Sequence, residues 1–521
     1  MESFIQRFEA HVIGCLKGFD RLVFRGTLRR LCYPKGMMAY LFAMKVLLKD
    51  FGDHVQKASD QLKRASLLVV EAAGRPTIYL PSSQTKKEPM ARRIAAEDKI
   101  TQGPICTLRS LEPCWSYEIY KNRETKKLEL QPRMRKCLHL YHYFIHPVFG
   151  FMSARIQPWF PFSIQICMNG REWLARQMDT IKLGYQRREN CFVWLEDIIQ
   201  AQKLMDAQLT VAWPELLQQI ARRLNPTHEQ MFANFPVDYY WSVYQSEWAT
   251  DIMFKNPAAL AAIYPALIHH GITTFSCADV MRFLGHKVSP SGNVDSRFRG
   301  EIISDLKRRP EGVRLKHYVG QNSLKLYDKQ GSVLRPECTI NDPKSFKVYR
   351  TREGDPDGEK DWRTLRKGIA DLHRRAEISQ AANERYLEAM AQVADKKPLK
   401  EMAEELCKPA SLAGRRVRAL NPLSADDAKL LQSINRGEFC LGGFRNRDLR
   451  TLIFGGTTSK EEQNRQSSAI TRKLRLLRAH GLIKKVTKTH RYMVTTKGRQ
   501  AITALVTARE TNTAELMKIA A

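Results

Sequence analysis

The spacing of hydrophobic and polar positions predicts helical and strand-rich regions that alternate along the chain. From Phe4 to about Val70 the apolar positions recur with the period of a helix, and this pattern returns from Phe192 to Leu224. Between them, from Ile105 to about Met168, apolar and polar positions alternate, and Asn122–Glu124 interrupts the alternation as a turn. This interval therefore predicts a β-hairpin within a strand-rich region.

A second region of mixed pattern runs from about residue 273 to residue 350. Within it, Val294–Arg309 has helical spacing and ends at the breaker Pro310–Gly312. Three alternating stretches separated by turns then predict strands: Val313–Val319, Leu324–Tyr327 and Val333–Ile340. The region is expected to combine helix and strand.

These patterns predict a multidomain α+β protein, and a length of 521 residues agrees because a domain takes about 150 residues. We divide the chain into five regions: a helical, basic N-terminal region (1–104), a mixed α+β body (105–225), a second α+β unit (226–350), a charged loop and helical linker (351–425) and a C-terminal domain (426–521).

The charge balance points to a polyanionic partner. The chain has 85 Lys and Arg against 54 Asp and Glu, a formal net charge of +31. Hydrophobic residues make up 43% of the sequence, which is ordinary for globular domains, so the charge does not come from a disordered basic tail. A folded surface of this sign favours nucleic acid as the partner.

The N-terminal residues, the longest apolar stretch and the cysteine spacing predict a cytoplasmic protein that does not enter a membrane. Met1–Arg7 contains an acid and an arginine where a secretory signal needs apolar residues. The longest apolar stretch, Ala258–Ile268, is about half of a membrane span and contains Pro265. The eleven cysteines are scattered without a paired spacing, which is typical of reduced thiols.

Residues 426–504 carry the strongest motif. Leu430 and Ile434 fit a first helix, Phe444–Leu449 begins a second, and Arg465–His480 forms a third that ends at Gly481. A small hairpin and a final helix follow. This order resembles the winged helix-turn-helix family, and the resemblance implies binding to duplex DNA through the third helix and the hairpin.

The third predicted helix has two chemically different faces. Ile470, Leu474 and Leu477 share an apolar face that must pack against other helices. The opposite face carries polar and basic residues that a recognition helix would present to base edges: Arg465, Ser468, Arg472 and Arg475. Further nucleic-acid contacts are assigned to Lys473, Arg478, Lys484, Lys485, Lys488 and Arg491. A solvated helix, or a winged helix used for protein contact, stays open as the alternative.

The second α+β unit offers two further hypotheses. Its order of elements is winged-helix-like, and its helix would present Arg297, Arg299, Lys307 and Arg308 to nucleic acid. Ser323–Lys329 followed by Val333–Glu337 is also similar to the paired strands of rolling-circle replication initiators, which cut one DNA strand through a tyrosine. That resemblance implies Tyr327, Asp328 and Glu337 as catalytic residues. It also implies that Asp328 and Glu337 hold Mg²⁺ or Mn²⁺ and that Lys329 contacts phosphate.

Two other groups of residues have the chemistry of metal ligands. The histidine pair separated by one hydrophobic residue that is common in such nicking enzymes is absent, but His139, His142 and His146 have helical spacing. Glu247 and Asp251 lie four residues apart and would share one helical face. Core packing is the more common outcome for the histidines, and a surface pair for the acids.

These observations support three functions. The first is a DNA-binding protein from a mobile element or replicon. The second is a metal-dependent endonuclease that nicks or transfers a DNA strand in replication or transposition, and the third is a protein that binds structured RNA. The sequence leaves open whether the chain is an enzyme and whether it forms a homodimer. Nucleotide hydrolysis and dinucleotide redox chemistry lack their glycine-rich motifs.

Overall fold

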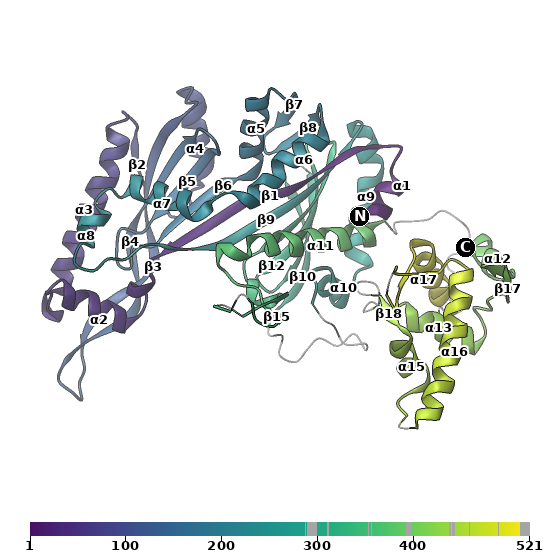
Figure 1. Ribbon diagram of the computed structural model, residues 1–521. Helices are drawn as coiled ribbons and strands as arrows, with labels where there is room; N and C mark the ends of the chain where they lie inside the picture. Colours follow the sequence, from purple (N-terminus) through teal and green to yellow (C-terminus); the bar gives the residue numbers. More distant parts are fainter. Residues whose placement is uncertain are drawn as a thin grey trace. The chain divides into compact units, whose positions relative to one another are not determined.

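The computed structural model describes residues 1–286, 288, 298, 300–309, 312–352, 354–355, 357–391, 399–436, 439, 443–457, 459–487 and 489–510, and these residues fold into two compact units. The body unit comprises Ile13–Leu260 and Tyr327–Gln380. The C-terminal unit comprises Met1–Val12, Ala261–Leu326 and Ala381–Ala521. The chain is a mixed α+β protein in which each unit collects segments that lie far apart in the sequence (Figure 1).

The body unit is built on strands in the neighbour order β13-β9-β1-β6-β5-β4-β3-β2. Their bounds are β1 (Val12–Thr27), β2 (Thr77–Leu80), β3 (Gly103–Lys121), β4 (Leu128–His146), β5 (Gly150–Ile156), β6 (Ile164–Asn169), β9 (Tyr240–Phe254) and β13 (Val333–Ile340). The pairs β13/β9, β1/β6, β6/β5, β5/β4 and β4/β3 are antiparallel, and β2 runs parallel to β3.

The longest pair, β3 and β4, forms the hairpin that the sequence predicts. The turn is closed by a backbone hydrogen bond from Asn122 N to Lys127 O (2.9 Å). The Asn122 side chain accepts hydrogen bonds from the backbone of Glu124 (2.9 Å) and Thr125 (3.2 Å), as asparagine does in a tight turn.

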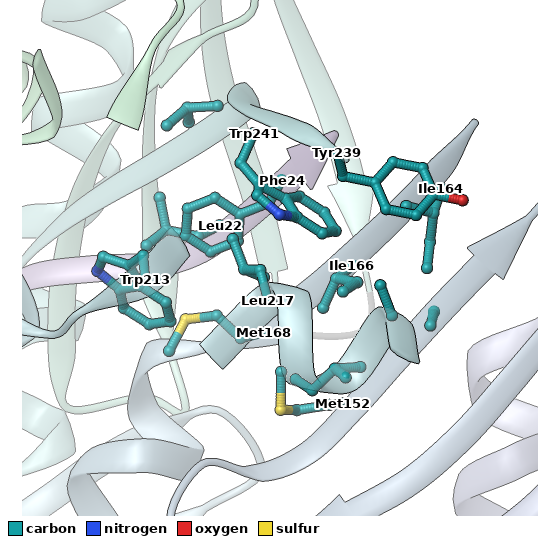
Figure 2. Close-up of a cluster of buried hydrophobic side chains, with 14 of the residues drawn as sticks. Leu22, Phe24, Met152, Ile164, Ile166, Met168, Trp213, Leu217, Tyr239 and Trp241 are labelled. Carbon is teal, nitrogen blue, oxygen red and sulfur yellow. The ribbon is translucent and has the colours of Figure 1, made fainter. Parts of the chain in front are cut away.

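Helices cover this sheet and bury its apolar side chains. The helices of the body unit are α2 (Pro34–Ala43), α3 (Phe51–Glu71), α4 (Lys87–Glu97), α5 (Gly170–Ile181), α6 (Ile198–Asp206), α7 (Trp213–Leu224) and α8 (His228–Met231), and short strand pairs are formed by β7 (Tyr185–Arg188) with β8 (Cys191–Leu195) and by β14 (Lys347–Arg350) with β15 (Asp361–Thr364). Figure 2 shows Leu22 and Phe24 of β1 beside Trp213 of α7. The ring centroids of Phe24 and Trp213 lie 4.9 Å apart. All three side chains are fully buried or nearly so.

The first part of the C-terminal unit surrounds a buried histidine. Its elements are α1 (Glu2–Arg7), α9 (Pro257–Thr273), α10 (Cys277–Phe283), β10 (Ile302–Arg309), β11 (Gly312–Val319), β12 (Asn322–Lys329) and α11 (Leu372–Met390), and the ends of α9, β12 and α11 pass into the body unit. His317 of β11 is within hydrogen-bond distance of Ser304 Oγ (2.7 Å) and Tyr386 Oη (3.0 Å). These polar contacts satisfy both ring nitrogens of a fully buried imidazole.

Residues 399–510, which we call the C-terminal segment, have their own hydrophobic core. Their elements are α12 (Leu399–Leu406), β16 (Ala410–Leu412), β17 (Arg415–Val417), α13 (Ala425–Ile434), β18 (Phe444–Arg445), α15 (Asn446–Phe454), α16 (Lys460–Ala479), β19 (Ile483–Lys485), β20 (Arg491–Val494) and α17 (Thr496–Glu510). The core joins Leu430, Leu449, Ile470 and Leu482 with Ile502. The strands β18, β20 and β19 form a small antiparallel sheet in that order.

The predicted strands 313–319, 324–327 and 333–340 are confirmed as β11, β12 and β13, but three helical predictions are wrong in part. Val12–Thr27 is strand β1, Cys191–Leu195 is strand β8, and Ile302–Arg309 is strand β10. The burial of β1 is nearly continuous, so the strand shows no clean alternation of apolar and polar positions. In β10, Ile302 and Leu306 lie four residues apart, a spacing that places two residues on one face of either a helix or a strand.

The sequence predicted a helix over 294–309 as part of a second winged helix in 226–350. The structure instead has strand β10 at Ile302–Arg309, and residues 294–297 and 299 lie outside the described residues. Within the described ranges, no single helix is both long and apolar enough to cross a membrane. Among the described helices, the pair α9 and α10 reaches that length and composition when taken together, and the two helices meet at an angle of 113°.

Candidate functional site

Helix α16 is held in the C-terminal segment by a capped start and an apolar face. The Ser459 side chain accepts a hydrogen bond from the backbone of Glu462, which caps the helix N-terminus. Ile470, Leu474 and Leu477 are buried in the core of the segment, as the helical period predicts. The orientation of the helix is therefore fixed by packing.

The opposite face of α16 carries most of the basic residues that the sequence singles out. Arg465, Ser468, Arg472 and Arg478 are exposed, whereas Lys473 and Arg475 are half-buried. Arg465 is 81% exposed, and its Nε lies 3.1 Å from Glu462 Oε2 in the first turn of the helix. Arg465, the first basic residue of this face, is therefore paired with the carboxylate of Glu462.

The β19–β20 hairpin extends the basic surface. Lys484 and Lys485 of β19 and Arg491 of β20 are exposed, and Lys485 lies opposite Tyr492 in the antiparallel register. Backbone contacts close the connection, from Val486 N to Arg491 O (2.9 Å) and from Thr489 N to Val486 O (3.2 Å). Lys488 lies outside the described residues.

Helix α15 is joined to α16 by side-chain hydrogen bonds. Nδ2 of Asn446, the first residue of α15, donates to Ser467 O (2.9 Å) and Thr471 Oγ1 (3.0 Å). Arg447, the next residue, is 70% exposed and adds a cation that the sequence analysis missed.

The basic residues predicted in the second α+β unit do not gather on a helix. Lys307 and Arg308 are exposed on strand β10, and Lys307 Nζ lies 3.3 Å from Asp305 Oδ2. Lys329, in contrast, is buried in the body unit with Nζ 4.0 Å from Glu189 Oε2. Arg297 and Arg299 lie outside the described residues.

The residues suggested by the nicking-enzyme resemblance separate into two environments in the body unit. Tyr327 Oη donates a hydrogen bond to Glu337 Oε2 across 2.6 Å. Asp328 Oδ1 instead accepts a hydrogen bond from Gly331 N (2.8 Å) in the turn between β12 and β13. Burial raises the pKa of Asp328, and the Gly331 contact opposes this. Tyr327 and Glu337 are thus brought together, and Asp328 is not.

Glu337 belongs to a different acidic group, which we call the acid cluster. Carboxylate oxygens of Asp20 (β1), Glu247 (β9) and Glu337 (β13) lie within 4.8 Å of one another. Asp20 and Glu337 are buried, and Glu247 is half-buried. The sequence analysis missed Asp20, because the neighbouring Lys17 and Arg21 give the segment the look of a solvated one and do not mark the acid as buried.

A buried ion network adjoins the acid cluster. Arg171, at the start of α5, donates from Nη2 to Asp251 Oδ2 (2.9 Å). Arg335 of β13 donates from Nη2 to the same oxygen (2.8 Å), from Nε to Asp251 Oδ1, and from Nη1 to Asp20 Oδ1 (3.3 Å). Burial opposes the charged form of Asp251, but the two arginines lower its pKa. Glu247 and Asp251 therefore have different partners.

The three histidines considered as metal ligands lie on or at the end of strand β4 and not on a helix. His142 is buried, and its ring nitrogens contact Ser66 Oγ (2.8 Å) and Thr107 Oγ1 (2.9 Å). The Nε2 of His139 contacts Arg155 Nη2 (3.1 Å), and Nδ1 of His146 accepts from the backbone of Val148 (3.2 Å). Each imidazole has its own protein partners, so the three do not form a common site.

The chain was compared with known proteins at three levels. No protein-family model, no curated protein and no solved structure matches it. What the chain does must therefore be inferred from its residues and their geometry.

Proposed function

We propose that the chain is a nucleic-acid-binding protein that binds duplex DNA through α16 and the β19–β20 hairpin, in the manner of a winged helix-turn-helix. The order of elements from α13 to α17 supports this assignment, because it is helix, strand, helix, helix, two strands and a final helix. The three strands also pair into one small sheet.

One observation carries the proposal: the exposed face of α16 is basic while its other face is buried. Arg465 and Arg472 project from the same side of a helix whose orientation is fixed by Ile470 and Leu474. A helix of this kind fits the major groove, where arginine reads guanine and serine reads several bases. Lys484 and Lys485 on the hairpin are suited to phosphate contacts, which position the protein without reading sequence.

The direct test is a charge reversal on the exposed face. In the double variant Arg465→Glu and Arg472→Glu, we expect about 100-fold weaker binding to duplex DNA at moderate salt, because two attractive charges become repulsive. Arg475 is left unchanged because it is half-buried and its reversal would disturb packing. Retention of a labelled duplex in a gel-shift titration measures the effect.

The control makes the same charge change elsewhere in the C-terminal segment. Lys400 and Lys408 are exposed, and Lys400→Glu with Lys408→Glu should lower DNA affinity by less than about fivefold if the surface of α16 is the binding site. Equal losses in both double variants would show that only net charge matters, and no loss in the first would overturn the proposal.

RNA binding and DNA cleavage are the two competing functions, and both can be tested with the same purified protein. An excess of structured RNA that displaces the duplex completely, while excess duplex does not displace RNA, would favour RNA binding. DNA cleavage would appear as relaxed circles when supercoiled plasmid is incubated with Mg²⁺ or Mn²⁺, and Glu337→Ala should abolish it. If the plasmid stays supercoiled while the gel shift succeeds, DNA binding stands without cleavage.

A further inference from the structure

We propose that the acid cluster of Asp20, Glu247 and Glu337 binds one divalent cation, Mg²⁺ or Mn²⁺. This site lies in the body unit and does not depend on DNA binding by α16. Hard cations of this kind prefer carboxylate oxygens, and the ligands of an octahedral Mg²⁺ lie about 3 to 4 Å apart. Oxygen atoms already within 4.8 Å of one another need only small side-chain rotations to reach that geometry.

The strand register explains why these acids meet. In the antiparallel pair β13/β9, Glu337 lies opposite Ala249 and Thr339 lies opposite Glu247. Alternate residues of a strand project from the same face, so Glu337 and Thr339 share the face of Glu247. The small side chain of Ala249 leaves room beside Glu337. Strand β1, next to β9 in the sheet, contributes Asp20.

Thr339 supplies an independent indication that something polar is bound here. Its side chain is only 3% exposed, and Oγ1 has no hydrogen-bond partner among the residues that the structure describes. A buried hydroxyl without a protein partner needs an explanation, and a bound water or ion is one. Because Thr339 lies opposite Glu247 in the register, its side chain projects from the same face of the sheet as the acid cluster.

The surroundings hold Asp20 in place for this role. Asn190 Nδ2 lies 2.7 Å from Asp20 Oδ1 and 2.9 Å from Oδ2, and it donates to this carboxylate. Arg335 Nη1 also donates to Asp20 Oδ1 (3.3 Å). Carboxylates gathered in a buried site repel one another, and a divalent cation relieves that repulsion without requiring protonation.

Titration of the full chain with Mn²⁺ at pH 8, followed by electron paramagnetic resonance, tests the proposal. We expect one bound Mn²⁺ per chain and at least tenfold weaker binding in Glu247→Gln and in Glu337→Gln. Asp238→Asn is the matched control, since Asp238 is a 69% exposed acid of the body unit that pairs with Arg222. Its Mn²⁺ affinity should equal that of the wild type.

Glu247→Gln and Thr339→Val test the same site even if Glu337→Gln does not fold. Glu247 is half-buried and easier to replace, and Mn²⁺ should raise the Tm of the wild type but not that of Glu247→Gln. Thr339→Val should weaken Mn²⁺ binding about threefold or more without lowering the Tm of the metal-free protein, because valine removes the unpartnered hydroxyl. The absence of saturable Mn²⁺ binding by the wild type, or unchanged affinity in Glu247→Gln, would overturn the proposal.

Discussion

The hydroxyl of Tyr327 donates a hydrogen bond to Glu337 Oε2 across 2.6 Å, from the end of β12 to β13. Burial raises the pKa of Tyr327 well above its usual range, and the Glu337 carboxylate adds to the rise. Tyr327 therefore stays protonated at neutral pH. In this arrangement it orients a carboxylate of the acid cluster and is not activated as a nucleophile.

Replacement of Tyr327 by phenylalanine should be destabilising, because it leaves a buried carboxylate oxygen without this donor. A hydrogen bond to a charged group contributes about 1.5 to 3 kcal/mol, so we expect a loss of that order in the free energy of unfolding. Urea unfolding followed by tryptophan fluorescence measures it. Tyr79→Phe, at an exposed position on β2, is the control and should change stability by less than about 0.5 kcal/mol. Equal stability of Tyr327→Phe and the wild type would contradict the role assigned to this contact.

Glu462 is paired with Arg465, one of the cations that we propose contact DNA. The two side chains form an ion pair at 3.1 Å in the first turn of α16, and Glu462 also places a negative charge where phosphates would approach. Glu462→Gln should therefore tighten duplex binding about two- to fivefold at low salt, with a smaller gain at high salt because the effect is electrostatic. Fluorescence anisotropy at two salt concentrations checks this. Weaker binding in the variant would mean that Glu462 supports the interface.

His142 makes the stability of the body unit depend on pH. Burial lowers the pKa of His142 to about 4, against about 6.5 in an unfolded chain. The unfolded state therefore binds the proton more readily between these values. Stability due to the neutral imidazole is complete above pH 6.5 and is lost progressively as the pH falls towards 4.

Replacement of His142 by glutamine removes this titration. The variant should be less stable than the wild type at pH 7, because the contacts with Ser66 and Thr107 are altered. Between pH 7 and pH 4.5 the difference from the wild type should shrink by about 2 to 3 kcal/mol. Unfolding curves at the two pH values provide the measurement. A difference that stays constant would show that His142 does not titrate in this way.

The parts of the fold that sequence patterns predicted are those in which local chemistry determines the structure. The β3–β4 hairpin was found because Asn122 marks its turn between two alternating stretches. The two faces of α16 were found because Ile470, Leu474 and Leu477 keep the helical period through the helix. Strand β1 was missed, since burial on both faces removes the alternation on which strand prediction depends.

The acid cluster could not be predicted from local patterns, because strand pairing brings together residues 20, 247 and 337. The expectation that Glu247 and Asp251 share a helical face is wrong, because both lie on strand β9, where residues four apart also share a face. Their different partners come from the neighbouring strand β13. Arg335 of β13 donates hydrogen bonds to Asp251, whereas Thr339 of β13 lies opposite Glu247.

The central proposal, that α16 and its hairpin contact duplex DNA, is tested most directly by photo-cross-linking the full chain to a bound duplex and mapping the linked peptides by mass spectrometry. We predict cross-links within Lys460–Ala479 and in the peptide that carries Lys484 and Lys485. Cross-links confined to the body unit, with none in α16 or the hairpin, would contradict the proposal.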